Sequence, residues 1–255
     1  MKRSGSDDRG WRDYGGHGPV IVLLHGFLGS MRYWDRLAPL LVAAGFRVVA
    51  LDLLGFGAAP KPRDSAYGYE EHIAHIADML RRHGIGDHVP LILAGHSMGA
   101  LIAKRFALAY PDRVSQLVLM HPPLYDGPEQ ARSTLRRTSR TYRILLDSRY
   151  RNLLWPAIRL LAAGTLRHRR WSREGSLANI IERAEAFTDL ARLNQPTLLI
   201  VGTSDRPEYQ RNLAAHDLPT NVRLELIAGG HHSPRRQATQ LGRLTTGFLK
   251  SSKTA

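Results

Sequence analysis

Residues 95–99 read Gly95-His96-Ser97-Met98-Gly99, a serine between two glycines. An apolar run precedes this pentapeptide (89–94), and a stretch with helical apolar spacing follows it (101–108). Glycines at a strand-to-helix junction let the two backbones approach closely, so the turn between them can be sharp and strained. We therefore expect a turn that lifts the Ser97 hydroxyl clear of the strand end, where it can act as a nucleophile.

Short apolar runs recur along the chain and alternate with helix-like segments. This pattern predicts a parallel α/β sheet with helices on both faces, a doubly wound arrangement. Reactive groups of such sheets gather beyond the carboxyl ends of the strands, where His25, Asp52, Ser97, His121 and Asp205 are all found. The predicted strands are 20–24, 48–53, 91–94, 114–120, 197–201 and 222–227.

Helical spacing and stop signals predict the segments between these strands. Ser30 is a candidate N-cap for a helix that runs through Trp34 and Leu40 and stops at Gly45. Further helices are expected over 70–83, from the serine turn to Tyr110, and over 236–249.

No strand pattern is present between His121 and about Phe187. Apolar residues recur there at helical spacing, with arginines on the opposing stripe, which indicates amphipathic helices. We interpret residues 122–188 as a helical cap inserted into a core formed by residues 1–121 and 189–255. Its apolar side chains are candidates for the roof of a substrate pocket: Leu124, Tyr142, Leu146, Leu153 and Trp155.

The net charge of the 255-residue chain is +14, and most of it lies in this insertion. Twelve arginines and a single acid, Asp147, fall between Arg132 and Arg173, a net charge of +11. Three interpretations stay open for these arginines: a solvated face, attraction of an anionic substrate, or contact with an anionic membrane surface. Nucleic acid is an unlikely partner because no binding module accompanies the basic residues.

The chain has no cysteine, which excludes disulfides, thiolate metal sites and a cysteine nucleophile. Its first ten residues are polar and lack the apolar segment of a secretory signal. No apolar run approaches the roughly 18 residues of a membrane span. We expect an intracellular, cytoplasmic protein that needs neither a metal nor a cofactor.

A serine hydroxyl needs a base to take its proton and a third group to orient that base. Histidine suits the base because its pKa lies near working pH. In Gly229-Gly230-His231-His232, after the last predicted strand, we favour His231 over its neighbour. Asp205 follows the strand before it and is the expected orienting acid, with Asp126 as the alternative.

The transition state also needs donors for a developing oxyanion. We expect them to be the backbone N–H groups of Met98, which follows the serine, and of Phe27, in the loop after the first predicted strand. His25, in the same loop, is expected to brace it by hydrogen bonds. Leu28, Leu124 and Trp155 are the candidate substrate contacts.

These stretches together resemble the α/β-hydrolase superfamily, in the form that carries a helical cap. The resemblance covers most of the chain from about residue 18, the cap excepted. In that superfamily the catalytic residues follow one another along the chain as serine, acid and histidine, and Ser97, Asp205 and His231 have the same order. The matching stretches are His25-Gly26-Phe27-Leu28-Gly29, Asp52-Leu53-Leu54-Gly55-Phe56-Gly57, Gly95-His96-Ser97-Met98-Gly99, Gly202-Thr203-Ser204-Asp205 and Gly230-His231.

The resemblance implies a serine hydrolase and leaves its substrate open. Epoxide hydrolases and haloalkane dehalogenases carry an aspartate at the position of Ser97. The segment 52–57 is similar to hydrolases that cleave carbon–carbon bonds of ring-fission products. The segment 25–34 is similar to the menaquinone-pathway enzyme that eliminates pyruvate, although Leu101 stands where that enzyme has an arginine.

The default function is cleavage of small carboxylic esters or related acyl substrates through an acyl-enzyme. One alternative is a carbon–carbon bond hydrolase or another non-ester member of the superfamily. A second alternative is a non-catalytic protein that binds an anionic partner through the arginine-rich cap.

Overall fold

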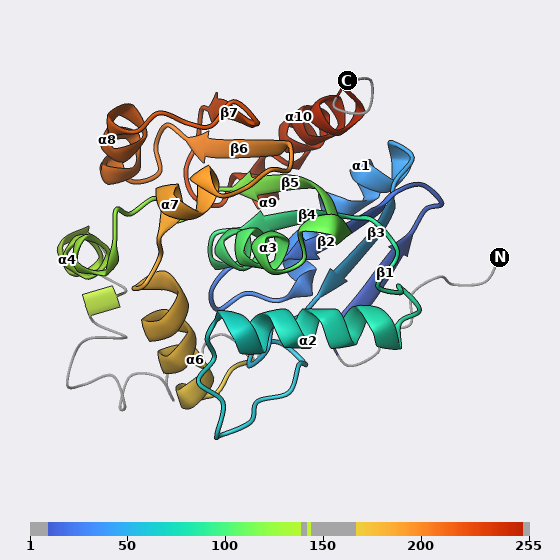
Figure 1. Ribbon diagram of the computed structural model, residues 1–255, viewed down its shortest axis with the longest axis horizontal. Helices are drawn as coiled ribbons and strands as arrows, with labels where there is room; N and C mark the ends of the chain where they lie inside the picture. The colour runs from blue at the N-terminus through green and yellow to red at the C-terminus, as the bar shows by residue number, and fades with distance from the viewer. Residues whose placement is uncertain (1–9, 139–141, 144–166, 252–255) are drawn as a thin grey trace.

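The computed structural model describes residues 10–138, 142–143 and 167–251. These residues form a seven-stranded sheet in the order β1-β3-β2-β4-β5-β6-β7, with helices on both of its faces (Figure 1). β1 pairs antiparallel with β3, and all other neighbouring strands are parallel. The predicted α/β class and the mostly parallel sheet are confirmed.

Most of the predicted strands are found within one or two residues of their expected bounds. In chain order the elements are β1 (Trp11–Gly15), β2 (Val20–Leu24), η1 (Met31–Trp34), α1 (Ala38–Ala43), β3 (Arg47–Leu51), α2 (Tyr69–Arg82), β4 (Leu91–His96), α3 (Met98–Ala109), η2 (Pro111–Arg113), β5 (Val114–Met120), α4 (Pro128–Thr138), α6 (Arg170–Ser176), η4 (Leu177–Ile181), α7 (Ala186–Ala191), β6 (Thr197–Gly202), α8 (Pro207–Ala215), β7 (Val222–Ile227), α9 (Ser233–Arg236) and α10 (Ala238–Ser251).

The central strand β2 is apolar and buried at every position because helices cover both faces of the sheet. In β2, Val22 and Leu24 pack into the core that includes Ile76 of α2 and the apolar face of α3. Ile21 and Leu23 point the other way, into the core beneath α1 and α10. Alternation of side chains along a strand therefore feeds two separate cores, as in other doubly covered parallel sheets.

The sequence analysis missed β1, which adds an antiparallel edge to the sheet beside β3. It was also wrong in expecting Ser30 to cap one helix that continues through Leu40. Ser30 makes no side-chain cap bond; a short 3₁₀ turn (η1) follows it, and α1 begins only at Ala38 with Pro39 in its first turn. Proline has no N–H for an intrahelical bond and is tolerated only at a helix start, so the chain begins a new helix there.

The strand predicted over 48–53 ends two residues early because Asp52 leaves the ladder. Its carboxylate accepts hydrogen bonds from the N–H groups of Met31 and Ala58, at 2.7 Å each. The predicted closing helix over 236–249 is found as α10, two residues further along the chain, and Gln237 separates it from the short α9. The Gln237 side chain turns back to donate to the carbonyl oxygen of Ala228 at 2.8 Å.

Helical segments lie between β5 and β6, in the interval that we interpreted as a cap. α6 and η4 contact the loop that follows β3: Ser172 donates to Gly55 O at 2.9 Å, and Asn179 donates to Ala66 O at 2.7 Å. The positions 139–141 and 144–166, which include Leu146, Leu153 and Trp155, lie outside the described residues. In the described part of the chain, no helix has the length and apolarity needed to cross a membrane.

A buried ion cluster joins α3 to α7. Asp189 is fully buried, and its Oδ2 lies 2.8 Å from Arg105 Nε and 3.2 Å from Lys104 Nζ. Lys104, also buried, donates to the carbonyl oxygen of Ala186 at 2.9 Å. Burial lowers the pKa of Lys104 to about 8, and Asp189 acts in the opposite direction. Asp189 is thus the acid that compensates two cations at this junction.

We predict that Asp189→Asn destabilises the protein more than Lys104→Met does. The first change leaves the buried Lys104 without its carboxylate, a situation that typically costs about 3–5 kcal/mol, whereas Arg105 keeps its ion pair with Glu185 at 2.9 Å. The second leaves Asp189 paired with Arg105. Urea unfolding of both variants at neutral pH measures the difference; an equal loss in the two would show that the carboxylate is not the organising charge.

Candidate active site

The turn between β4 and α3 holds Ser97 in a strained backbone conformation. Its φ of 54° and ψ of −118° place it in a region that residues with a side chain rarely occupy. A Cβ on Gly95 would stand 2.3 Å from Gly99 O, and one on Gly99 would stand 2.3 Å from Leu24 O. The two glycines therefore permit the close approach on which this turn depends, as predicted from the pentapeptide.

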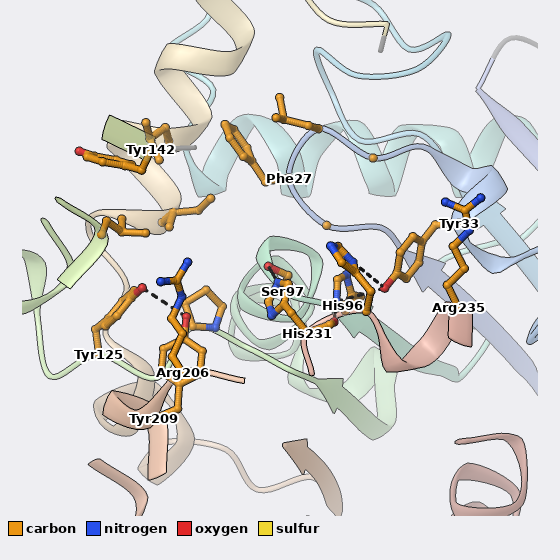
Figure 2. Close-up of a pocket in the computed structure, with 18 of the residues that line it drawn as sticks. Phe27, Tyr33, His96, Ser97, Tyr125, Tyr142, Arg206, Tyr209, His231 and Arg235 are labelled. Carbon is orange, nitrogen blue, oxygen red and sulfur yellow. Dashed lines mark hydrogen bonds between the residues drawn. The ribbon is translucent and has the colours of Figure 1, made fainter. Parts of the chain in front are cut away.

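Three residues that are distant in sequence meet at the carboxyl ends of the strands. His231 Nε2 lies 3.0 Å from Ser97 Oγ, and His231 Nδ1 lies 2.9 Å from Asp205 Oδ2. Figure 2 shows the His231 ring directly beside Ser97. The alternative acid, Asp126, points elsewhere, toward Gln130 and His216. The geometry thus brings together Ser97, His231 and Asp205, with Asp205 in the place of the orienting acid.

A second histidine also contacts Asp205. His121 follows β5, is fully buried, and its Nδ1 lies 3.3 Å from the same Oδ2 that faces His231. The same Nδ1 lies 3.2 Å from the backbone nitrogen of Gly202, and Nε2 of His121 is hydrogen-bonded to the Ser233 hydroxyl. Burial acts to raise the pKa of Asp205, but the hydrogen bonds from His121 and His231 outweigh it and hold that pKa well below its usual range. The carboxylate therefore stays ionised beside His231.

The loop that carries His231 is tied to the serine turn through His96. His96 Nε2 lies 2.7 Å from His231 O, so this nitrogen carries the proton and donates to the carbonyl. Tyr33 stacks on the His96 ring, with 4.6 Å between ring centroids. Burial lowers the pKa of His96 well below its usual value, which keeps the ring neutral. The neutral His96 ring therefore holds the backbone of His231 through this hydrogen bond and places no positive charge next to the His231 ring.

His25 braces the loop after β2, as expected from the sequence. Its Nδ1 donates to Gly26 O at 2.8 Å, and its Nε2 accepts from the N–H of Leu53 at 3.0 Å. Because Leu24 pairs with Gly95 in the parallel ladder, this loop begins beside the strand that ends at Ser97. The brace therefore fixes the segment around Gly26 and Phe27 against the serine turn.

The two expected oxyanion donors lie on either side of Ser97. Met98 is the first residue of α3, so its N–H has no acceptor within that helix. Phe27 lines the cavity above the serine (Figure 2), and no backbone hydrogen bond of the described residues uses its N–H. Both amides can therefore serve an oxygen that develops charge near the serine.

A cavity of about 700 Å³ opens over Ser97. Leu28 lines it, as predicted, whereas Leu124 is fully buried in the core and only its neighbours Pro123 and Tyr125 line the cavity. Trp155 lies outside the described residues. The described lining comprises Gly26, Phe27, Leu28, Gly29, Tyr33, Arg36, His96, Ser97, Pro123, Tyr125, Leu135, Tyr142, Leu177, Ile181, Arg206, Tyr209, His231, His232, Arg235 and Arg236.

Sequence reasoning assigned no role to several of these side chains. His121 was noted at a strand end, but a lone histidine there carries no signal of a contact with Asp205. Tyr33, Arg206 and Arg235 come from separate loops and helix ends, and nothing in their local sequence places them around one cavity. Only the three-dimensional fold reveals this part of the lining.

We predict that the stabilising effect of Asp205 depends on pH in the acid range. Its folded pKa lies below that of the unfolded chain, about 3.9, so its contribution to stability is complete above that pH and is lost as the pH falls below it. The stability difference between the wild type and Asp205→Asn should stay constant from about pH 7 to about pH 5 and shrink below about pH 4. Urea unfolding across this range measures it; a difference that grows on acidification would contradict the assigned direction.

Comparisons with known proteins identify the family of this fold. Residues 19–234 match the model of the alpha/beta hydrolase fold family. A putative non-heme chloroperoxidase of Synechocystis sp. is 30% identical over 266 aligned positions, and the alignment covers 92% of each protein. A bromoperoxidase from Bacillus anthracis has a similar crystal structure, with a TM-score of 0.71, 24% identity and 94% coverage of both chains.

A shorter match connects the chain to a probable lysophospholipase, BODYGUARD 1 of Arabidopsis thaliana, at 34% identity over 120 residues. That match covers 45% of this chain and only 25% of the plant protein, so it concerns a part of each. The family model spans most of the chain, including the serine turn and His231. The chain belongs to the alpha/beta hydrolase fold family.

Proposed function

We propose that the protein is a serine hydrolase that cleaves carboxylic esters through an acyl-enzyme intermediate. The observation that carries this proposal is the continuous contact from Ser97 Oγ through the His231 ring to the Asp205 carboxylate. Serine nucleophiles depend on such a chain because the free hydroxyl is weakly reactive at neutral pH. The proposal needs no metal or cofactor.

The proposed reaction begins when Ser97 Oγ attacks the acyl carbon and His231 Nε2 accepts the hydroxyl proton. The N–H groups of Phe27 and Met98 donate to the oxyanion of the tetrahedral intermediate. This intermediate then collapses, and His231 gives its proton to the departing alcohol. Water attacks the acyl-enzyme with His231 again as base, which releases the carboxylic acid and restores Ser97. Asp205 keeps the imidazole oriented and stabilises its charged form throughout.

The shape of the cavity supports an apolar acyl group. Leu135, Tyr142, Leu177 and Ile181 line it on the side of α4 and η4, and Phe27 and Leu28 continue this surface toward the serine. We also propose that residues 122–188 act as the cap that closes the site, since α4 and η4 contribute these walls. The plant relative is named as a probable lysophospholipase, and such an enzyme also cleaves a carboxylic ester with a long apolar acyl chain.

Carbon–carbon bond cleavage remains the alternative within the same superfamily, because the same three residues can perform it. A non-catalytic binding role is disfavoured by the intact contacts among Ser97, His231 and Asp205. A substrate panel separates the first two: short p-nitrophenyl esters, thioesters, lactones and a ring-fission dienone. Preferential turnover of the dienone would replace the ester proposal.

We predict that Ser97→Ala abolishes esterase activity, with a fall in kcat of at least about 10⁴-fold, because the covalent step is lost. Asp205→Asn should lower kcat by about 10³–10⁴-fold because the imidazole loses its orienting charge. Hydrolysis of p-nitrophenyl butyrate and covalent labelling by a fluorophosphonate measure both effects. Ser115→Ala is the matched control, since Ser115 is exposed at the opposite end of β5 and should keep full labelling. Labelling that survives in Ser97→Ala would refute the assigned nucleophile.

We further predict that Leu177→Phe shifts acyl-chain preference toward short chains. The larger side chain fills part of the apolar wall, and pocket contacts discriminate at about tenfold or more per methylene-sized clash. The ratio of kcat/KM for p-nitrophenyl octanoate over acetate should fall by at least about tenfold. Leu40→Phe, at an exposed position of α1, should leave the ratio unchanged. An unchanged ratio in both variants would place the acyl chain elsewhere.

A further inference from the structure

The cavity over Ser97 has two chemically different arms. The apolar arm lies under α4 and η4, whereas the other arm lies over η1 and α9. Figure 2 shows Tyr33 and Arg235 on one side of the Ser97–His231 pair, with Tyr142 and Tyr125 on the other. We call the lining formed by Tyr33, Arg36, His232, Arg235 and Arg236 the basic arm.

The charge of the basic arm is not neutralised by the acids around it. No Asp or Glu is among the described residues that line the cavity. Asp35, the neighbour of Arg36, is occupied by Arg12 at 2.6 Å and by the Tyr14 hydroxyl at 2.6 Å. Asp205, the nearest acid of the reacting group, is held by His231 and His121. Three guanidinium groups thus line one end of a cavity without a carboxylate of their own in its described walls.

The backbone fixes this arm close to the reacting atoms. α9 starts two residues after His231, and the N–H groups of Arg235 and Arg236 both donate to His232 O, at 3.2 and 3.1 Å. The Arg36 guanidinium donates to the carbonyl oxygen of Arg235 at 3.4 Å, which links the segment between η1 and α1 to α9. The arginines are therefore presented by a short, braced segment that is continuous with the loop of His231.

The chemistry of the reaction decides which part of a substrate meets the basic arm. In the proposed mechanism His231 must hand its proton to the leaving group, so the leaving group lies on the side of His231. The basic arm continues that side, while the apolar arm receives the acyl chain. Arg206 also lines the cavity but lies on the side of Tyr125 and Tyr209, away from Arg235 (Figure 2).

We propose that the basic arm binds a phosphate group on the leaving alcohol or thiol of the substrate. The inference rests on the proposed hydrolase function and names its substrate class: an apolar acyl ester or thioester whose departing part is anionic. Arginine suits phosphate because its planar fork donates two parallel hydrogen bonds. Two leaving groups share this chemistry, a glycerol phosphate from a lipid and a phosphate-bearing thiol such as coenzyme A.

Two matched substrate pairs test the proposal and distinguish these sources. Octanoyl-glycerol phosphate is compared with octanoyl-glycerol, and octanoyl-coenzyme A with the octanoyl thioester of N-acetylcysteamine. We expect kcat/KM to favour the phosphate-bearing member of at least one pair by about tenfold or more, the effect of one charge-assisted hydrogen bond. The preference should decrease as salt rises from about 0.02 M to about 0.5 M, because the arm is exposed to solvent.

The double variant Arg235→Gln/Arg236→Gln should remove this preference, so that the ratio of kcat/KM for the phosphate-bearing member over the neutral member falls to about one. Arg243→Gln/Lys250→Gln is the matched control, since it removes two positive charges from exposed positions of α10 outside the described cavity lining. An equal loss in both variants would assign the effect to net charge alone and overturn the proposal. Equal turnover of both members in both pairs by the wild type would also overturn it, while the hydrolase assignment would stand.

A binding measurement keeps the inference testable apart from catalysis. Octyl phosphate carries an apolar chain and a phosphate that can span the two arms, and its affinity is measured by calorimetry with octanol as the uncharged comparison. We expect the double variant to bind octyl phosphate about tenfold more weakly than the wild type, with the α10 control unaffected. Equal affinities in the wild type and the double variant would overturn the proposal even if no ester were turned over.

Discussion

Close packing between β4 and α3 is the constraint on which the rest of the site depends. Gly99 stands so near the end of β2 that a single added Cβ would overlap Leu24 O, and Gly95 is equally close to Gly99. This approach leaves Ser97 no ordinary backbone conformation, so its side chain projects above the carboxyl edge of the sheet. The parallel ladder then brings the ends of β2, β5 and β6 to the same edge. The fixed Ser97 hydroxyl is therefore the point around which His231 and Asp205 are arranged.

Asp205 supplies the negative charge of the site at this edge of the sheet. A buried carboxylate is costly unless hydrogen bonds replace its hydration; the Asp205 side chain is only 4% exposed, and His231 and His121 contact it from two different strand ends. The arrangement therefore links stability to chemistry: the same bonds that keep Asp205 ionised also orient His231 toward Ser97. Ser233, bonded to His121, extends the network into the helix that carries the basic arm.

Local sequence patterns predicted those features of the molecule that depend on only a few neighbouring residues. The strand runs, the glycine-flanked Ser97 and the candidate partners Asp205 and His231 follow from patterns within a few residues. β1 could not be predicted this way, because its existence depends on pairing with β3 across more than thirty positions of sequence. The same holds for His121, whose contact with Asp205 spans 84 positions. Contacts made only by the fold leave no signature in one sequence.

The charged residues show most clearly the difference between what local sequence patterns predict and what only the fold determines. The sequence draws attention to the twelve arginines between 132 and 173, yet the guanidinium groups of the basic arm come from Arg36, between η1 and α1, and from α9. They are few and lie apart in the sequence, with 199 positions between Arg36 and the Arg235 carbonyl to which it donates. An exposed charge contributes little on its own. The three guanidinium groups of the basic arm lie together beside His231. In the proposed reaction His231 gives its proton to the leaving group, so these charges would act on the leaving group of the substrate. The position of a charge relative to the reacting atoms, rather than the net charge of a segment, therefore defines the expected substrate.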